Sequence, residues 1–193
     1  MAESKNRLEH YSILKYLLRW TLLTLPVSIA IGSMVALFLW LLNAVIHYRF
    51  EHHRLLYFLP LAGLLIHFIY KGIGKSSEKG NNLIVDAIHS PGAGIPARMG
   101  AIVLITTIIT HLFGGSAGRE GTAVQIGGSL ADFFAKRFAL NSSDRKTLLT
   151  AGVAAGFGAV FGTPLTGAVF PMEVLTIGRV KYGALLPCVM ARI

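Results

Sequence analysis

A long apolar run near the start of the chain constrains its fold more than any other feature. The run extends from Tyr16 to Ile46, and charged or amide side chains interrupt it only at Arg19 and Asn43. A helix needs about 20 residues to cross the hydrocarbon region of a bilayer. This run is longer, so it predicts a steeply tilted membrane helix. Pro26 lies inside it, where a membrane helix tolerates a kink.

The composition also indicates a chain that lies in lipid. Hydrophobic residues make up 53% of the 193 positions and charged residues only 14%. Soluble domains usually carry about 25% charged residues, so too little polar surface is available here to cover a water-soluble globule. Many of the 21 glycines lie inside apolar segments. This pattern is typical of membrane helices whose backbones approach one another closely.

The formal net charge of +9 is concentrated at the ends of the apolar runs. The basic residues in question are Lys5, Arg7, Lys15, Arg19, Lys71, Lys75, Lys79, Lys136, Arg137, Arg145 and Lys146. This distribution favours contact with anionic lipid headgroups on the inner side of a membrane, and it makes nucleic acid an unlikely partner.

Orientation follows from the same basic residues. The N-terminal segment, residues 1–15, and the loop Lys71–Lys79 carry more of them than the polar loop predicted at His47–Arg54. We therefore expect residues 1–15 to be cytoplasmic and residues 16–193 to form a multi-pass domain in the cell inner (plasma) membrane.

After a second crossing at Leu55–Tyr70, the apolar segments become short and are interrupted by glycine and proline. The expected helices are 82–89, 97–113, 122–140, 146–161 and one from Gly162-Thr163-Pro164 to about Glu173, followed by the incomplete run 182–193. The pattern predicts an all-α polytopic membrane protein with tilted and broken helices. Broken helices can place positive helix ends inside the membrane, where an anion can bind, although ordinary kinked helices would give a similar pattern.

The segment Gly115–Thr122 carries the chemistry. It places Arg119 and Glu120 in a glycine-rich break between two apolar helices, and ionisable groups at membrane depth are usually functional. Glycines here allow N–H groups to point at a ligand. Because Glu120 is expected just before a helix, its carboxylate can occupy the same site as a free anion, and protonation would release it. The alternative is that Glu120 only pairs with Arg119 or caps the helix.

These residues resemble the GREGP signature of the CLC chloride channel and transporter family. The matching residues are Gly118-Arg119-Glu120-Gly121-Thr122, with Gln125-Ile126-Gly127-Gly128 after them. Residues 148–157 and 162–170 resemble a second family segment, AAGxxAxFxxPLxGxxF. The resemblance implies that Glu120 is the gating glutamate and that Gly118, Arg119, Gly121 and Thr122 border the anion. It also implies a homodimer and an inverted repeat, of which this chain would be one half.

Three departures from the family pattern point to its fluoride-exporting branch. Thr122 stands where most members have proline. Asn81 lies 39 residues before Glu120, at the spacing of the family's anion-binding serine, whereas Ala93 in a similar motif is too close. Val174 replaces the second glutamate of many proton-exchanging members. An amide at Asn81 offers strong donors to replace the water around a small, strongly hydrated fluoride ion.

The expected function is therefore fluoride/proton antiport, with halide anions, protons and lipid as partners. A chloride-conducting channel remains an alternative, as does a fragment without activity of its own, because the family's second half is not present. A membrane enzyme that uses Glu120, His111 and Arg119 for acid–base chemistry is less favoured. The sequence carries no metal-ligand cluster, nucleophile elbow or nucleotide-binding loop, so we expect neither an enzyme nor a cofactor.

Overall fold

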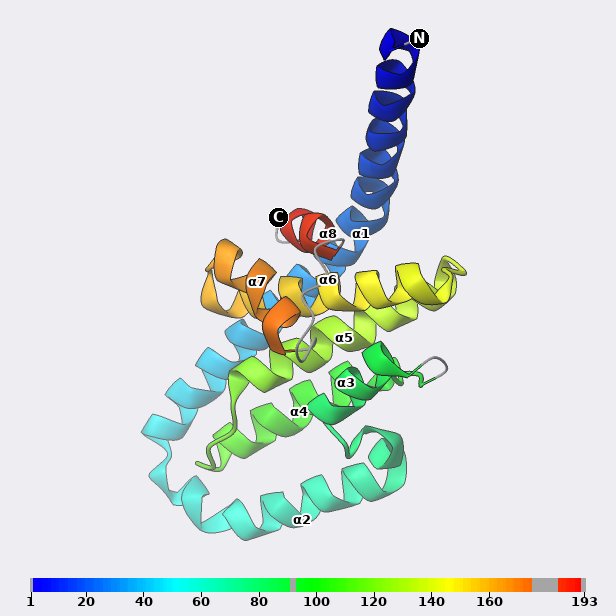
Figure 1. Ribbon diagram of the computed structural model, residues 1–193. Coiled ribbons are helices and arrows are strands. Elements are labelled where there is room, and N and C mark those ends of the chain that lie inside the picture. Colours follow the sequence, from blue (N-terminus) through cyan, green and yellow to red (C-terminus); the bar gives the residue numbers. More distant parts are fainter. Residues whose placement is uncertain (1, 91–92, 175–183, 192–193) are drawn as a thin grey trace.

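The computed structural model describes residues 2–90, 93–174 and 184–191, and the regular elements of this part of the chain are all helical (Figure 1). The α-helices are α1 (Ala2–Glu51), α2 (Leu59–Ile69), α3 (Asn81–His89), α4 (Arg98–Leu112), α5 (Arg119–Arg137), α6 (Ser142–Phe161), α7 (Pro164–Val174) and α8 (Leu185–Met190). Short 3₁₀-helical segments occupy His53–Phe58 and Lys75–Ser77, and a π-helical turn occupies Tyr70–Gly74. The all-α architecture expected from the sequence is confirmed.

Helix α1 has one face against the other helices and one face turned outward. Its buried side chains recur every three or four residues, at Trp20, Val27, Ile31, Val35, Phe38 and Leu42. Leu22, Leu25, Ile29, Leu37 and Trp40 are apolar and exposed between them, as expected for a helix in contact with lipid. In Figure 1 the N-terminal end of α1 projects beyond the bundle, while its later part lies against other helices.

The predicted polar loop at His47–Arg54 is wrong for most of its length. Helix α1 runs through Pro26 and continues to Glu51, and a new turn begins at His53. The polar side chains of this stretch lie on helical backbone, where His52 N donates to Tyr48 O at 3.1 Å. The helix also begins at Ala2, so it includes residues 2–15 of the segment that the sequence set apart.

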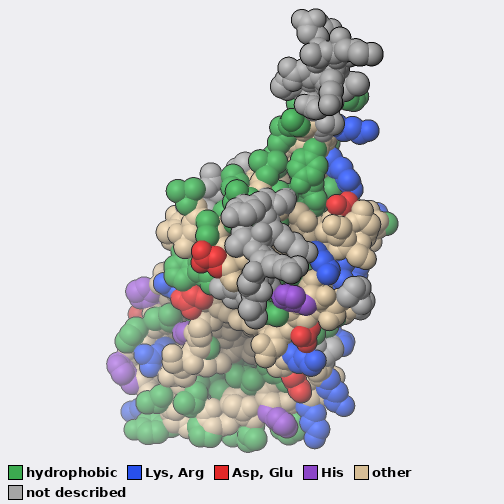
Figure 2. Space-filling view, viewed as in Figure 1, with side chains coloured by type: hydrophobic (Ala, Val, Ile, Leu, Met, Phe, Trp, Pro, Cys, Tyr) green, Lys and Arg blue, Asp and Glu red, His purple; other side chains and the backbone are tan. Residues whose placement is uncertain are grey.

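Within the described residues, two continuous helical stretches are long and apolar enough to cross a membrane, Ile13–Glu51 and His53–Gly74. In the second stretch only 6% of the most apolar window is buried within the chain. Helix α2 therefore presents its apolar side chains outward. Figure 2 shows apolar side chains over much of the visible face, while Lys and Arg gather toward the edge where Figure 1 places α3 and the C-terminal end of α5.

Glycines bring helices α5 and α6 into backbone contact. A Cβ on Gly127 would lie 2.2 Å from the carbonyl oxygen of Gly152, and one on Gly156 would lie 2.4 Å from the carbonyl oxygen of Ala123. No other residue fits at these positions without moving a helix. Gly162 ends α6 in the left-handed conformation, with φ +63°.

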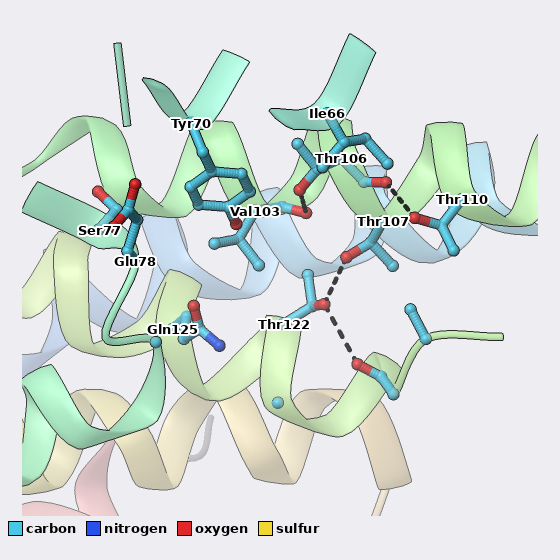
Figure 3. A pocket seen from close by; sticks show the side chains of 14 residues that line it. Ile66, Tyr70, Ser77, Glu78, Val103, Thr106, Thr107, Thr110, Thr122 and Gln125 are labelled. Atoms are coloured by element: carbon cyan, nitrogen blue, oxygen red, sulfur yellow. Dashed lines mark hydrogen bonds between the residues drawn. The ribbon is translucent and has the colours of Figure 1, made fainter. Parts of the chain in front are cut away.

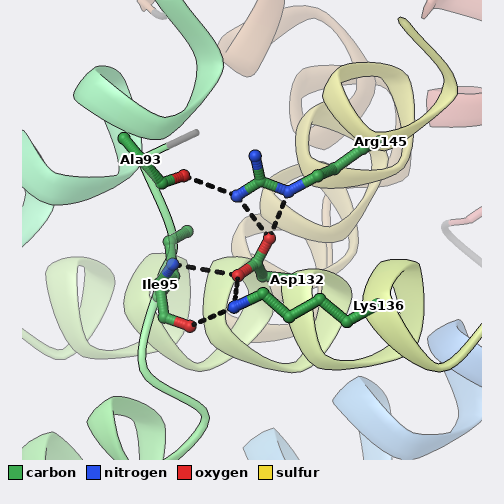
Figure 4. A network of polar contacts seen from close by, with 5 residues as sticks. All are labelled: Ala93, Ile95, Asp132, Lys136 and Arg145. Carbon is green, nitrogen blue, oxygen red and sulfur yellow. Dashed lines mark hydrogen bonds and ion pairs between the residues drawn. The ribbon is translucent and has the colours of Figure 1, made fainter. Parts of the chain in front are cut away.

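A buried carboxylate fixes the far end of α5 (Figure 4). Asp132 is fully buried and accepts a hydrogen bond from Ile95 N at 2.9 Å. It also forms ion pairs with Lys136 (2.7 Å) and Arg145 (2.6 Å). Arg145 in turn donates to Ala93 O. The network joins α5 to α6, through Arg145, and to the connection before α4, through Ile95. The C-terminal end of α5 is therefore held by two neighbouring segments.

Replacing Asp132 tests this network. Asp132→Ala leaves Arg145 largely buried beside an empty acceptor position, which should cost about 3–5 kcal/mol of stability. We expect a clear fall in the temperature at which the detergent-solubilised protein loses its monodisperse gel-filtration peak. Asp86→Ala is the matched control, because Asp86 pairs with Lys79 at the surface, at 3.4 Å. Equal shifts in the two variants would contradict a structural role for Asp132.

Candidate functional site

The break between α4 and α5 is built by glycines. Helix α4 ends at Leu112, and Gly114 then adopts φ +84°, a left-handed conformation that favours glycine. Gly115 N donates to Thr110 O at 2.8 Å and turns the chain back over the end of α4. Gly118 follows in an extended conformation, with φ −70° and ψ 118°, and serves as the N-cap of α5.

Helix α5 begins earlier than the sequence predicted. The expected start was Thr122, but the first helical residue is Arg119. The N–H of Thr122 points back to Gly118 O at 3.4 Å and closes the first turn. Glu120 therefore lies within the first turn of the helix, as its second residue, rather than before it. No side chain among the described residues caps this helix end.

The carboxylate of Glu120 folds back toward the start of the helix. Its Oε2 atom lies 3.4 Å from the position that a Cβ on Gly118 would take, and Oε1 lies 3.6 Å from Nε of Arg119. The side chain is 43% exposed, so the ion pair with Arg119 is open to solvent in this chain. A negative charge beside the first N–H groups of a helix is favourable, because these groups have no intrahelical partner.

Helix α3 brings a second helix start to the same place. Asn81 is its first residue, after Gly80 with φ +55°. The side-chain nitrogen of Asn81 lies 3.6 Å from the Cβ position of Gly121, and that of Gln125 lies 3.7 Å from the Cβ position of Gly80. Ile84 of α3 packs against Gly128 of α5: a Cβ added to Gly128 would lie 2.9 Å from Cδ1 of Ile84.

The structure therefore brings Asn81 to the first turn of α5, together with Gly118, Arg119, Glu120, Gly121 and Thr122. The similar motif around Ala93 lies elsewhere. Ala93 accepts a hydrogen bond from Arg145, beside Asp132 at the opposite end of α5. Val174 is the last residue of α7, and Glu173 next to it is exposed.

Thr122 faces α4 rather than the Glu120 side chain. Its Oγ1 atom is 2.8 Å from Oγ1 of Thr107 and donates to Gly118 O at 3.2 Å. Both threonines are buried. Nδ1 of His111 lies 2.9 Å from Thr107 O, which gives this histidine a local structural partner. Thr122 thus connects the first turn of α5 to α4.

A cavity of about 430 Å³ lies beside the first turn of α5, on the side that faces α4 (Figure 3). It is lined by Ile66, Tyr70, Ser77, Glu78, Gly80, Val103, Thr106, Thr107, Thr110, Ala117, Gly118, Gly121, Thr122 and Gln125. Sequence reasoning missed this polar lining. The one available signal was the spacing of Thr106, Thr107 and Thr110, which puts three hydroxyls near one side of an otherwise apolar helix. Across the described ranges, no cluster of three or more His, Cys, Asp or Glu could hold a metal ion.

Comparison with known proteins places this geometry in context. The family model described as "Voltage gated chloride channel" matches residues 62–193. The "Chloride/fluoride channel protein" of Pseudomonas syringae pv. tomato is 49% identical over 187 residues, which cover 97% of this chain and 41% of that protein. The "H(+)/Cl(-) exchange transporter ClcA" of Salmonella arizonae is 37% identical over 86 residues, 39% of this chain and 18% of the transporter.

A solved structure shares the fold. The structure described as "Crystal structure of a CLC-type fluoride/proton antiporter" aligns with a TM-score of 0.86 at 36% identity. The alignment covers 91% of this chain and 45% of the antiporter chain. The chain thus spans less than half the length of these relatives.

The packing contact between α3 and Gly128 of α5 provides a test of the site. Gly128→Ala would place a methyl group 2.9 Å from Ile84 and push α3, with Asn81 at its start, away from α5. We expect weaker halide binding to the intact protein by isothermal titration calorimetry. Gly32→Ala on α1 is the control, because nothing lies within 4 Å of the added Cβ. Unchanged binding in Gly128→Ala would show that the position of α3 does not matter for the site.

Proposed function

The chain belongs to the voltage gated chloride channel family, and on this premise we propose that it supplies the anion-binding half of a transporter that exchanges a halide for protons. Family membership makes it a membrane protein, in agreement with its apolar helices. One observation carries the proposal: the carboxylate of Glu120 lies over the start of α5, where no side chain of the described residues caps the helix.

In this proposal Glu120 is a tethered competitor for the transported anion. While ionised, its carboxylate occupies the positive end of α5 and keeps a free anion out. Protonation removes the charge, the side chain leaves the helix start, and an anion takes its place. Return of the carboxylate expels the anion and releases the proton elsewhere. One side chain thereby couples the two movements in opposite directions.

We further propose that the anion is held by donors from two helix starts. Backbone N–H groups around Gly118, Arg119 and Gly121 are available at α5, and the Asn81 amide supplies donors from α3. The Arg119 guanidinium adds positive charge near the entrance. Thr122 borders the same site, but its hydroxyl already donates to Gly118 O, so we assign it to holding the turn in shape.

Fluoride is the proposed preferred anion. The Asn81 amide offers direct donors in place of water, and two matches that cover over nine-tenths of this chain are described as a chloride/fluoride channel protein and a fluoride/proton antiporter. Chloride is the second candidate, since an 86-residue stretch matches an H(+)/Cl(-) exchange transporter at 37% identity. The proposal also includes an inner (plasma) membrane location, a cytoplasmic N-terminus, a homodimer and no enzymatic activity.

Glu120→Gln tests the coupling. Glutamine keeps the size of the side chain but neither carries the competing charge nor binds a transferable proton. In liposomes containing the intact protein, we expect halide efflux to continue while halide-driven proton movement disappears. Glu51→Gln, at the exposed end of α1, should retain both fluxes. Full proton coupling in Glu120→Gln would rule out the proposed role.

Asn81→Leu tests anion selection. Leucine has the same branched shape and number of heavy atoms as asparagine, though it is bulkier, and it has no donors, so the penalty should be larger for the more strongly hydrated fluoride ion than for chloride. Loss of one such hydrogen bond to an ion costs about 1.5–3 kcal/mol, which corresponds to roughly a tenfold or greater fall in fluoride affinity. The fluoride-to-chloride flux ratio should fall as well, because chloride loses less. Asn141→Leu, which removes the cap of α6, is the control. An unchanged flux ratio in Asn81→Leu would remove Asn81 from the selectivity mechanism.

A further inference from the structure

The hydroxyl of Thr107 differs from those of the other two threonines late in α4. Thr106 and Thr110 donate to carbonyl oxygens four residues earlier in their own helix, at 2.9 and 2.8 Å. Thr107 Oγ1 instead lies 2.8 Å from Thr122 Oγ1 of α5 (Figure 3). Both residues are buried, at 5% and 3% exposure, so the bond between their hydroxyls is shielded from water. The pair is thus a buried polar contact between two helices.

The direction of this contact follows from the number of protons available. A hydroxyl has one proton to donate, and Thr122 Oγ1 donates its proton to Gly118 O at 3.2 Å. Thr107 is therefore the donor and Thr122 the acceptor in the bond between the two hydroxyls. The bonds form a directed chain from Thr107 through Thr122 to the carbonyl of Gly118. Hydrogen bonds in such a chain polarise and strengthen one another.

The chain ends on the peptide unit that joins Gly118 to Arg119. Gly118 O also accepts from Thr122 N, but at 3.4 Å, which is longer than the usual value of about 2.9–3.0 Å. Glycine restrains its backbone least of all residues, so this peptide unit gains from a second bond. Because a trans peptide is planar, the N–H of Arg119 points away from Gly118 O and out of the helix start. The Thr122 hydroxyl thereby aligns the Arg119 N–H and makes it a stronger donor.

Packing of α4 against α5 does not depend on the threonine pair. About two turns before Thr107, Gly100 lets the helices approach closely, since a Cβ added there would lie 3.3 Å from Cα of Ile126. The same Cβ would lie 2.5 Å from Oγ of Ser129. The pair therefore adds orientation to a helix contact that other residues already make.

We propose that Thr107 is a positioning residue, which acts through Thr122 on the Arg119 N–H, one of the donors assigned above to the transported anion. This inference rests on the proposed anion site at the start of α5. Each hydroxyl keeps its own proton, so the chain transfers alignment and polarisation only. Fluoride must exchange a tightly held water shell for protein donors, so it gains more than chloride from an aligned and polarised N–H. The threonine chain thus favours fluoride at this helix start.

The test measures fluoride and chloride binding to the intact protein by isothermal titration calorimetry. All variants carry Glu120→Gln, because the native carboxylate competes for the same N–H groups and would mask a change in their strength. Thr107→Val, Thr122→Val and the double variant keep the branched side-chain shape and remove the hydroxyls. Thr107→Ser keeps the hydroxyl, and Thr107→Ala removes it a second way. Thr150→Val is the matched control, because Thr150 is buried on α6 and donates only within its own helix, to Lys146 O at 2.9 Å.

We expect Thr122→Val to weaken fluoride binding about two- to tenfold, as for the loss of one hydrogen bond, and chloride binding by less. Thr107→Val and Thr107→Ala should lose about twofold, at the lower end of the same range. Thr107→Ser and Thr150→Val should bind both ions as Glu120→Gln alone does. Because Thr107 acts only through Thr122, the double variant should bind fluoride as weakly as Thr122→Val and no more weakly.

Three results would overturn the role of Thr107 and leave the anion site standing. The first is unchanged fluoride binding when the Thr107 hydroxyl is removed. The second is a loss in Thr107→Ser equal to that in Thr107→Val, which would assign the effect to the shape of the side chain. The third is a double variant whose loss is the product of the two single losses, which would show that the two threonines act separately. Absence of any halide binding in Glu120→Gln alone would instead overturn the proposed anion site, and the inference with it.

Discussion

A helix that begins inside a membrane leaves its first N–H groups without intrahelical partners, and lipid offers none in their place. In the proposed function helix α5 begins in this way at Arg119, after an N-cap glycine that has no side chain to offer. The carboxylate of Glu120 lies over this position from within the first turn. Most of the surrounding structure can be understood as a means of holding this helix start in a fixed position beside α3 and α4.

Two kinds of contact hold α5 in place. Along its length, Gly127 and Gly156 allow α6 to approach until backbone atoms touch. At its far end, the buried Asp132 joins α5 to Arg145 of α6 and to Ile95 before α4. The Asp132 contact lies at the opposite end of α5 from Glu120, and the glycine contacts begin at Ala123, one turn after it. Among the described residues no side chain caps the first turn, which leaves this helix end open to an exchangeable ligand while the following turns are packed against α6.

The sequence predicted those features that depend on local pattern. Apolar runs and interrupting glycines gave the helical membrane fold, and the ordered motifs around Glu120 gave the family. The break at Gly114 and Gly115 is present for the reason expected, since Gly114 has a positive φ.

Features that depend on contacts between distant segments could not be predicted in this way. The start of α5 was placed three residues late, because Gly118, Arg119 and Glu120 have no helical pattern and are drawn into the turn by the Thr122 N–H. The loop predicted at His47–Arg54 is mostly helix, since polarity alone does not end a helix whose backbone bonds are satisfied. The cavity was invisible because Ser77, Thr106 and Gln125 come from three separate elements.

The most direct test of the account is the position of a bromide ion in crystals of the intact protein, located by anomalous scattering. Because the Glu120 carboxylate and the anion are taken to compete for one place, the account predicts a bromide peak at the N–H groups that begin α5 in Glu120→Gln. The same peak should be absent or much weaker in the native protein. A peak of equal height in both proteins, or none at this helix start in the variant, would contradict the account.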